Sequence, residues 1–137
     1  MGGIDIPILL TFLPSIIYIP KYFCFMIVRN YTEIDEKEVN EEGAKNVKIQ
    51  WLIDEKVAPN FAMRRFVVGK DGYTPFHKHD WEHEVFVLQG KGAVVDENGK
   101  ERELKPGDFV LVLPNEMHQF KNKGDENFIF LCLIPLK

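Results

Sequence analysis

The chain reads His77-Lys78-His79-Asp80-Trp81-Glu82-His83 past its midpoint, and this stretch contains three of its four histidines. The fourth ends Pro114-Asn115-Glu116-Met117-His118, a turn that follows an apolar run. Neutral imidazole is a common ligand of first-row transition metals. Side chains two residues apart on an extended strand face the same way, so His77 and His79 can bind one ion. With no histidine elsewhere, the pattern predicts one metal site formed by His77, His79, His83 and His118; the alternative is ordinary surface histidines.

Composition limits the class of protein. A mass of 15.9 kDa corresponds to one domain with a single core. The net charge of −4 and pI of about 5.6 provide no basic field, so no nucleic-acid partner is expected. Cys24 and Cys132 lack the spacing of a disulfide framework, which favours reduced thiols in a cytoplasmic protein. Cys132 lies in the apolar run 128–134, where we expect a buried, inert thiol; the alternative is a thiol facing the metal cavity.

Residues 1–25 differ from the rest of the chain. They are strongly apolar, with Asp5 and Lys21 as the only charges, and prolines stand at positions 7, 14 and 20. Repeated prolines are unfavourable in a membrane helix, and the basic start and cleavage site of a signal peptide are missing. We expect this leader to lie outside a functional domain at 26–137, with translation starting at Met26. A membrane anchor and an extra strand packed on a partner subunit are the alternatives.

The remainder predicts short strands separated by turns. The expected strands are 48–53, 61–68, 84–88, 93–95, 102–104, 109–113 and 128–135. Turn residues stand at 69–72, 96–99 and 105–108, and the Asn98-Gly99 pair is a strong hairpin signal. No segment has the pattern of an amphipathic helix. The sequence therefore predicts an all-β antiparallel sandwich or barrel.

At these residues the chain resembles the cupin superfamily, whose first motif is Gly, His-x-His, three or four residues, Glu, six residues and Gly. Here His83 stands three residues after His79 and six before Gly90, so it occupies the family's Glu position. Glu84 fits only the longer gap, and Gly90 then comes one residue early. Upstream, Gly72 is one residue closer to His77 than the motif asks. Glu84 is thus the alternative to His83 as a ligand.

The second motif runs from Gly107 to His118, and Asn122 follows at the family's offset. Pro114 is displaced by one position, and Glu116 replaces the motif's internal glycine. The resemblance covers about 61–134 and implies a jelly-roll barrel, a double-stranded β-helix, that holds one metal ion. The four-histidine set and the run 81–84 are similar to small manganese cupins of thermophiles. Manganese is therefore the first choice, with iron, nickel, cobalt, copper or zinc as alternatives.

Four neutral imidazoles on an octahedral ion leave two positions open for water, oxygen or a small-molecule substrate. The hypothesis we favour is an oxygenase of a small organic molecule. A non-redox isomerase or lyase of a sugar or keto acid is the second hypothesis, although the sequence nominates no general base. A small-molecule binding or sensor module is the third. No catalytic residue and no organic cofactor site are assigned.

Further candidates lie around the histidines. Glu82 and Glu84 are near enough to hydrogen-bond a ligating imidazole, although both also suit solvated surface. Arg64 and Arg65 are adjacent, so one can point inward and anchor a carboxylate, unless both are surface charges. Five phenylalanines are expected to form the cavity wall or the core: Phe76, Phe86, Phe109, Phe120 and Phe130. Open sheet edges and apolar faces predict a homodimer.

Overall fold

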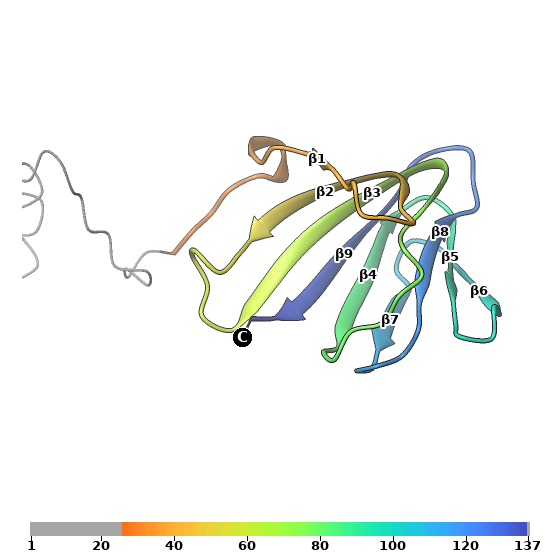
Figure 1. Ribbon diagram of the computed structural model, residues 1–137. Coiled ribbons are helices and arrows are strands. Elements are labelled where there is room, and N and C mark those ends of the chain that lie inside the picture. The colour runs from red at the N-terminus through yellow and green to blue at the C-terminus, as the bar shows by residue number, and fades with distance from the viewer. Residues whose placement is uncertain (1–25, 137) are drawn as a thin grey trace, which may run out of the picture.

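The computed structural model describes residues 26–136, so the expectations for the leader at 1–25 lie outside the described residues. Antiparallel strands make up the described chain, which is a double-stranded β-helix, or jelly roll (Figure 1). The elements are η2 (Tyr31–Glu33), β1 (Lys37–Glu38), β2 (Lys45–Ile53), β3 (Phe61–Tyr73), β4 (His83–Gln89), β5 (Gly92–Val95), β6 (Glu101–Leu104), β7 (Phe109–Val112), β8 (Gln119–Asn122) and β9 (Phe128–Pro135). No helix in this part of the chain is long and apolar enough to cross a membrane.

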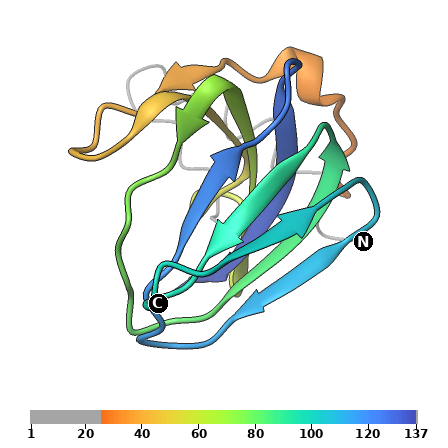
Figure 2. The same ribbon diagram turned by 90° about the vertical axis from the view of Figure 1, so that its right-hand side faces the viewer.

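One curled sheet runs in the order β6-β5-β8-β3-β9-β4-β7, and β2 pairs with β3. The long strand β3 joins the two halves of the barrel, because its first part pairs with β2 and β9 and its end pairs with β8. Figure 2 shows β8, β5 and β6 as the second half, facing the curved surface of the first. The concave side between the halves holds the core and the cavity described below.

Alternation along the strands decides which side chains enter the barrel. On β4, the even-numbered residues 84, 86 and 88 are exposed, while His83, Val85 and Val87 are buried. The buried core is apolar and contains Val47, Val68, Val85, Val87, Leu104, Val112, Phe120, Phe128, Phe130 and Cys132. Phe128 and Phe130 are fully buried and pack with ring centroids 5.3 Å apart. This two-residue period places His83 on the inner side, in line with the core.

The expected hairpin is confirmed. β5 pairs with β6, and Gly99 at φ +77° donates its N–H to the Asp96 carbonyl oxygen over 3.0 Å. The turn at 105–108 is also confirmed, with Gly107 at φ +92°. Both turns are specified by local residues that accept a positive φ.

The turn expected at 69–72 is wrong, because β3 continues through it to Tyr73. The local signal marks a bend within the strand. Asp71 has φ +62°, and the register against β2 shifts between Lys45 and Val47. Gly72 is needed there, since a Cβ atom would lie 2.7 Å from the Lys45 carbonyl oxygen. Strand β8 was not expected from the sequence at all.

The phenylalanines divide between the two sides of the sheet. Phe120 and Phe130 face inward as expected, whereas Phe86 and Phe109 lie on the outer surface of β4 and β7, with Phe109 81% exposed. Phe76 is also exposed, in the segment before β4. Leu88, Leu111 and Leu113 are exposed beside them, so this outer surface is an apolar patch.

Candidate metal centre

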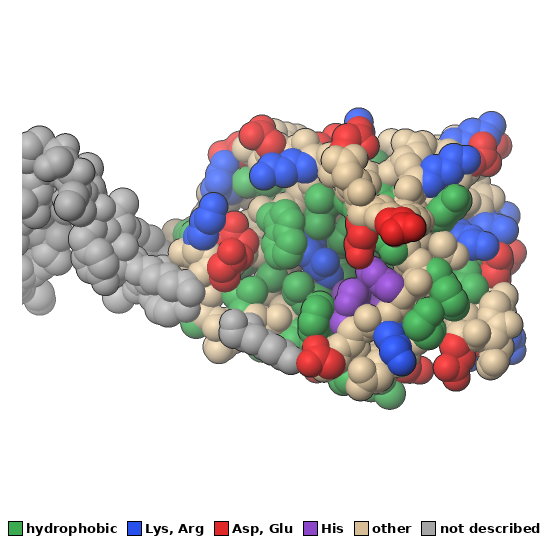
Figure 3. Space-filling view, in the orientation of Figure 1, with side chains coloured by type: hydrophobic (Ala, Val, Ile, Leu, Met, Phe, Trp, Pro, Cys, Tyr) green, Lys and Arg blue, Asp and Glu red, His purple; other side chains and the backbone are tan. Residues whose placement is uncertain are grey.

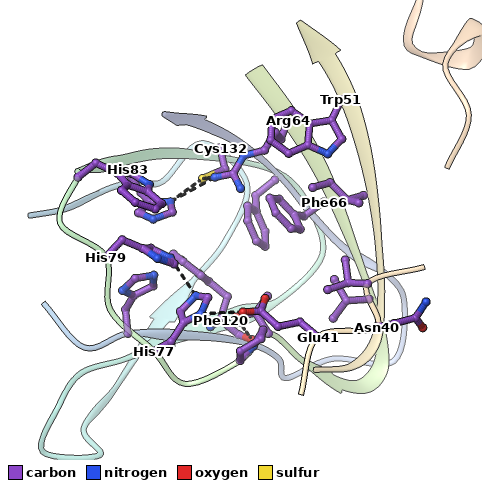
Figure 4. Close-up of a pocket in the computed structure, with 18 residues that line it drawn as sticks. Asn40, Glu41, Trp51, Arg64, Phe66, His77, His79, His83, Phe120 and Cys132 are labelled. Atoms are coloured by element: carbon purple, nitrogen blue, oxygen red, sulfur yellow. Dashed lines mark hydrogen bonds and ion pairs between the residues drawn. The ribbon is translucent and has the colours of Figure 1, made fainter. Parts of the chain in front are cut away.

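All four histidines meet at one end of the barrel interior. The ring centroids lie 4.2 Å apart for His77 and His79, 4.8 Å for His79 and His83, and 5.0 Å for His83 and His118. Ring nitrogens of His77, His79 and His118 all lie within 4.8 Å of one another, close enough to share an ion. His83 stands against this group (Figure 4). The arrangement brings the predicted residues together; ligation by all four stays a prediction.

Backbone hydrogen bonds hold the two motifs together. His77 and His118 form an antiparallel bridge, in which the His118 N–H donates to the His77 carbonyl oxygen over 2.9 Å and the reverse bond measures 3.2 Å. The Asn115 N–H donates to the His79 carbonyl oxygen over 2.6 Å. Asn115 adopts φ +68°, which turns the second motif back toward the first. Two loops far apart in sequence thus present their imidazoles to one point.

Three of the four imidazoles are held through Nδ1. His118 Nδ1 lies 2.9 Å from the Glu116 carbonyl oxygen, and His83 Nδ1 lies 3.2 Å from Cys132 Sγ. His77 Nδ1 lies 3.5 Å from a carboxylate oxygen of Glu41. The acceptors beside His118 and His77 favour the tautomer with the proton on Nδ1, which leaves Nε2 free to bind a metal. His83 Nδ1 also lies 3.3 Å from Arg64 Nη2, a group that can only donate. The fourth ring, His79, stacks on Trp81 at a centroid distance of 4.6 Å.

Two Nε2 atoms face each other at the centre of the cluster. His79 Nε2 lies 3.1 Å from His77 Nε2. His83 Nε2 is buried and has no hydrogen-bond partner among residues 26–136, which is costly for a polar atom. An ion bound between these nitrogens would satisfy all of them, so the residues present fit a divalent transition metal.

The site favours neutral imidazoles. Burial lowers the pKa of His83 to about 3, and the positive charge of Arg64 acts in the same direction. Burial, with repulsion from His77 and His118, lowers the pKa of His79 to about 4. Burial also lowers the pKa of His118. Neutral imidazole is the form that coordinates a metal, so these rings need not lose a proton to bind one near neutral pH.

The two glutamates proposed to support the histidines do not face the site. Glu82 and Glu84 are both exposed, and Glu84 lies on the face of β4 opposite to His83. His83 is 5% exposed. The supporting contacts come instead from Glu41, the Glu116 carbonyl group and Cys132. Glu41 belongs to the loop before β2, and its distance in sequence from the motifs explains why it was missed.

One row of side chains crosses three strands beside His83. Arg64 is opposite Trp51 on β2 and opposite Cys132 on β9 in the strand register. Arg64 points inward, as expected for one of the two arginines, and its Nη2 donates to Cys132 Sγ over 3.0 Å. Cys132 is buried in the core, as expected, and it also lines the cavity, which was the alternative. The register places it there opposite Arg64.

The cavity has a volume of about 370 Å³. Its walls are mostly apolar, and the residues around the histidines are Val39, Val47, Ile49, Trp51, Phe66, Phe120 and Phe130. Figure 3 shows histidine side chains reaching the surface on this side of the barrel, surrounded by hydrophobic side chains. Phe66 is a wall residue that the sequence did not nominate. A volume of this size accommodates a small organic molecule in contact with the histidines.

These features define a class: a small jelly-roll barrel with a cluster of histidines at the end of an apolar cavity. The family model described as "Cupin domain" matches residues 64–134. The chain belongs to the cupin family.

Similar proteins differ in what their names say they do. The chain is 30% identical to an oxalate-binding protein of Thermotoga maritima, over 81% of this chain and 94% of that protein. It is 35% identical to a glucose-6-phosphate isomerase of Thermococcus litoralis, over 74% of this chain and 63% of that protein. The solved polyketide cyclase RemF of Streptomyces resistomycificus superposes with a TM-score of 0.77 at 32% identity, covering 82% of this chain and 81% of that one. Family membership therefore establishes the fold, and the reaction has to be argued from the residues of the site.

Proposed function

We propose that the chain is a metal-dependent enzyme that converts a small organic molecule, with His77, His79, His83 and His118 as the ligands of one divalent ion. The observation that carries the proposal is the meeting of four imidazoles in a cavity of about 370 Å³, with a buried Nε2 on His83 that has no hydrogen-bond partner among residues 26–136. A resident ion would supply Lewis-acid charge and open coordination positions. Manganese is the ion we propose, on the resemblance to four-histidine manganese cupins.

The chain's own residues would do three things in this reaction. Glu41, Glu116 and Cys132 keep the imidazoles oriented through Nδ1. The aromatic wall excludes water and packs on the body of the substrate. The lowered pKa values of His79 and His83 keep these rings unprotonated, so they do not serve as proton donors near neutral pH.

Oxygenation is the reaction we favour, because an apolar cavity beside a nitrogen-only ligand set suits a redox ion and a substrate without many polar groups. Isomerisation is the second candidate, and one observation supports it. Glu41 lines the cavity with its carboxylate group, and a carboxylate is the kind of general base that an isomerase needs.

The test starts from metal analysis of protein purified without chelators, followed by oxygen-uptake assays with a panel of small oxygenated and unsaturated compounds. We expect one ion per chain and oxygen consumption with at least one compound. Both should be lost in His79→Ala and kept in Glu82→Gln, whose side chain is exposed. Conversion of aldose or ketose phosphates under nitrogen, abolished by Glu41→Gln, would favour the isomerase. Protein that retains no ion under any condition would contradict both reactions.

A further inference from the structure

Arg64 places a positive charge inside the cavity without a carboxylate partner. Its only hydrogen-bonding contacts among residues 26–136 are Cys132 Sγ at 3.0 Å and His83 Nδ1 at 3.3 Å, both on uncharged groups. Arg64 Nε is buried and has no hydrogen-bond partner in this part of the chain. The neighbouring Arg65 differs: it contacts Glu36 at 3.8 Å and Gln50 at 2.9 Å, outside the cavity.

An enclosed charge of this kind is normally paired. The one carboxylate lining the cavity is that of Glu41, which lies beside His77 and away from Arg64 (Figure 4). Apart from Glu41, the side chains that line the cavity in the described part of the chain are histidine, cysteine, neutral polar or apolar ones beside Arg64, and none of them is a carboxylate. A divalent ion would add further positive charge. The cavity therefore favours an anion as its occupant.

The surroundings of the guanidinium select the kind of anion. Its centre lies 5.5 Å from the Trp51 ring and 5.1 Å from the Phe66 ring, so aromatic side chains pack around it. Its in-plane N–H groups match the planar, two-oxygen edge of a carboxylate. A phosphate group has three strong acceptor oxygens, whereas Arg64 is the one cationic side chain among the described residues that line this cavity. A carboxylate is therefore the better match to this single guanidinium group.

We propose that the cavity binds a small carboxylate, with Arg64 anchoring the carboxylate group beside the histidines. This inference rests on the proposed function for its metal, and it names the substrate class of the same site. Arg64 is thus assigned to substrate binding, and Trp51 and Phe66 to packing against the substrate's body.

The test is calorimetric titration of the full-length, manganese-loaded protein with benzoate and with its neutral analogue benzamide. We expect benzoate to bind more tightly than benzamide. Arg64→Gln should weaken benzoate binding about tenfold to a hundredfold, the range for a hydrogen bond to a charged group. Arg65→Gln, the matched control, should change it less than about twofold, since Arg65 does not line the cavity and contacts Gln50 and Glu36 instead.

Three results would overturn the proposal. The first is equal affinity for benzoate and benzamide in the unmodified protein, a comparison that needs no variant to fold. The second is loss of metal from Arg64→Gln, which would make Arg64 a support of His83. The third is tighter, Arg64-dependent binding of phenyl phosphate. Repeating the titration on metal-free protein separates the two proposals. A chain that binds no metal would refute the metal-dependent enzyme. The dependence of benzoate binding on Arg64 can still be measured in that protein, and it tests the carboxylate site by itself.

Discussion

Replacing His83 with alanine should empty the metal site, whereas Glu84→Gln should leave it full. His83 is 5% exposed, with its Nε2 turned into the barrel. Losing an outer hydrogen-bond partner of a ligand typically lowers metal affinity 10- to 100-fold, and losing the ligand itself removes a larger contribution. We therefore expect at least about a 100-fold rise in the metal Kd of His83→Ala, or about 2.8 kcal/mol. For Glu84→Gln we expect less than about a twofold change.

The assay is competition for manganese with a chromophoric chelator, accompanied by elemental analysis of dialysed protein. Circular dichroism of both variants without metal checks that the barrel still forms. Glu84→Gln is a matched control, because Glu84 lies next to His83 on the same strand and faces solvent.

The opposite result would refute the strand register as well as the ligand set. If Glu84→Gln loses the ion and His83→Ala keeps it, Glu84 must face the barrel interior. A shift of one residue exchanges the two faces of a strand, so Val85 and Val87 would then leave the core. The metal assay therefore also tests the pairing of Val85 with Cys132.

Without metal, the folded state should lose stability as the pH drops below about 6.5, because unfolded histidine takes up a proton there while folded His83 stays neutral until its pKa of about 3. Calorimetry at pH 7 and pH 5 checks this, and an equal Tm at both would contradict it. A homodimer should form through the apolar patch on β4 and β7, and Phe109→Lys should give a monomer by light scattering at micromolar concentration. A strictly monomeric unmodified chain would argue against it. A chain beginning at Met26 should bind metal as well as the full chain, since the described strands begin at Lys37; aggregation or metal loss in that shortened chain alone would make residues 1–25 part of the fold.

The parts of the fold that were predictable have local causes. The bounds 128–135 of the last strand agree with the structure, because an apolar run that follows a polar stretch and ends at a proline is readable from the sequence alone. The hairpin around Asn98-Gly99 was predictable from turn chemistry. In contrast, β8 is short and three of its four residues are polar, and its pairing with β5 and with the end of β3 holds it in place. Strands stabilised by such distant partners carry little local signal.

The metal site likewise has a part that was predictable from the sequence and a part that was not. Histidine spacing was enough to bring the four residues together, since each motif is short. What each imidazole contacts through Nδ1 was not predictable, because Glu41 and Cys132 reach the site through tertiary packing. Proximity in sequence pointed to Glu82 and Glu84, and the alternation of β4 turns Glu84 outward.

The choice of reaction depends on residues that the family motifs do not contain. The family match spans 64–134, which includes the histidines, Arg64 and Cys132. Glu41 and Trp51 line the same cavity and precede that span. Similar proteins carry names as different as isomerase and cyclase, so membership of the family alone does not specify a reaction. The wall from the loop before β2 and from β2 itself therefore contributes to substrate choice together with Arg64, and exchanging Trp51, which contacts no histidine ligand in the described structure, should alter which small molecule binds before it alters the metal.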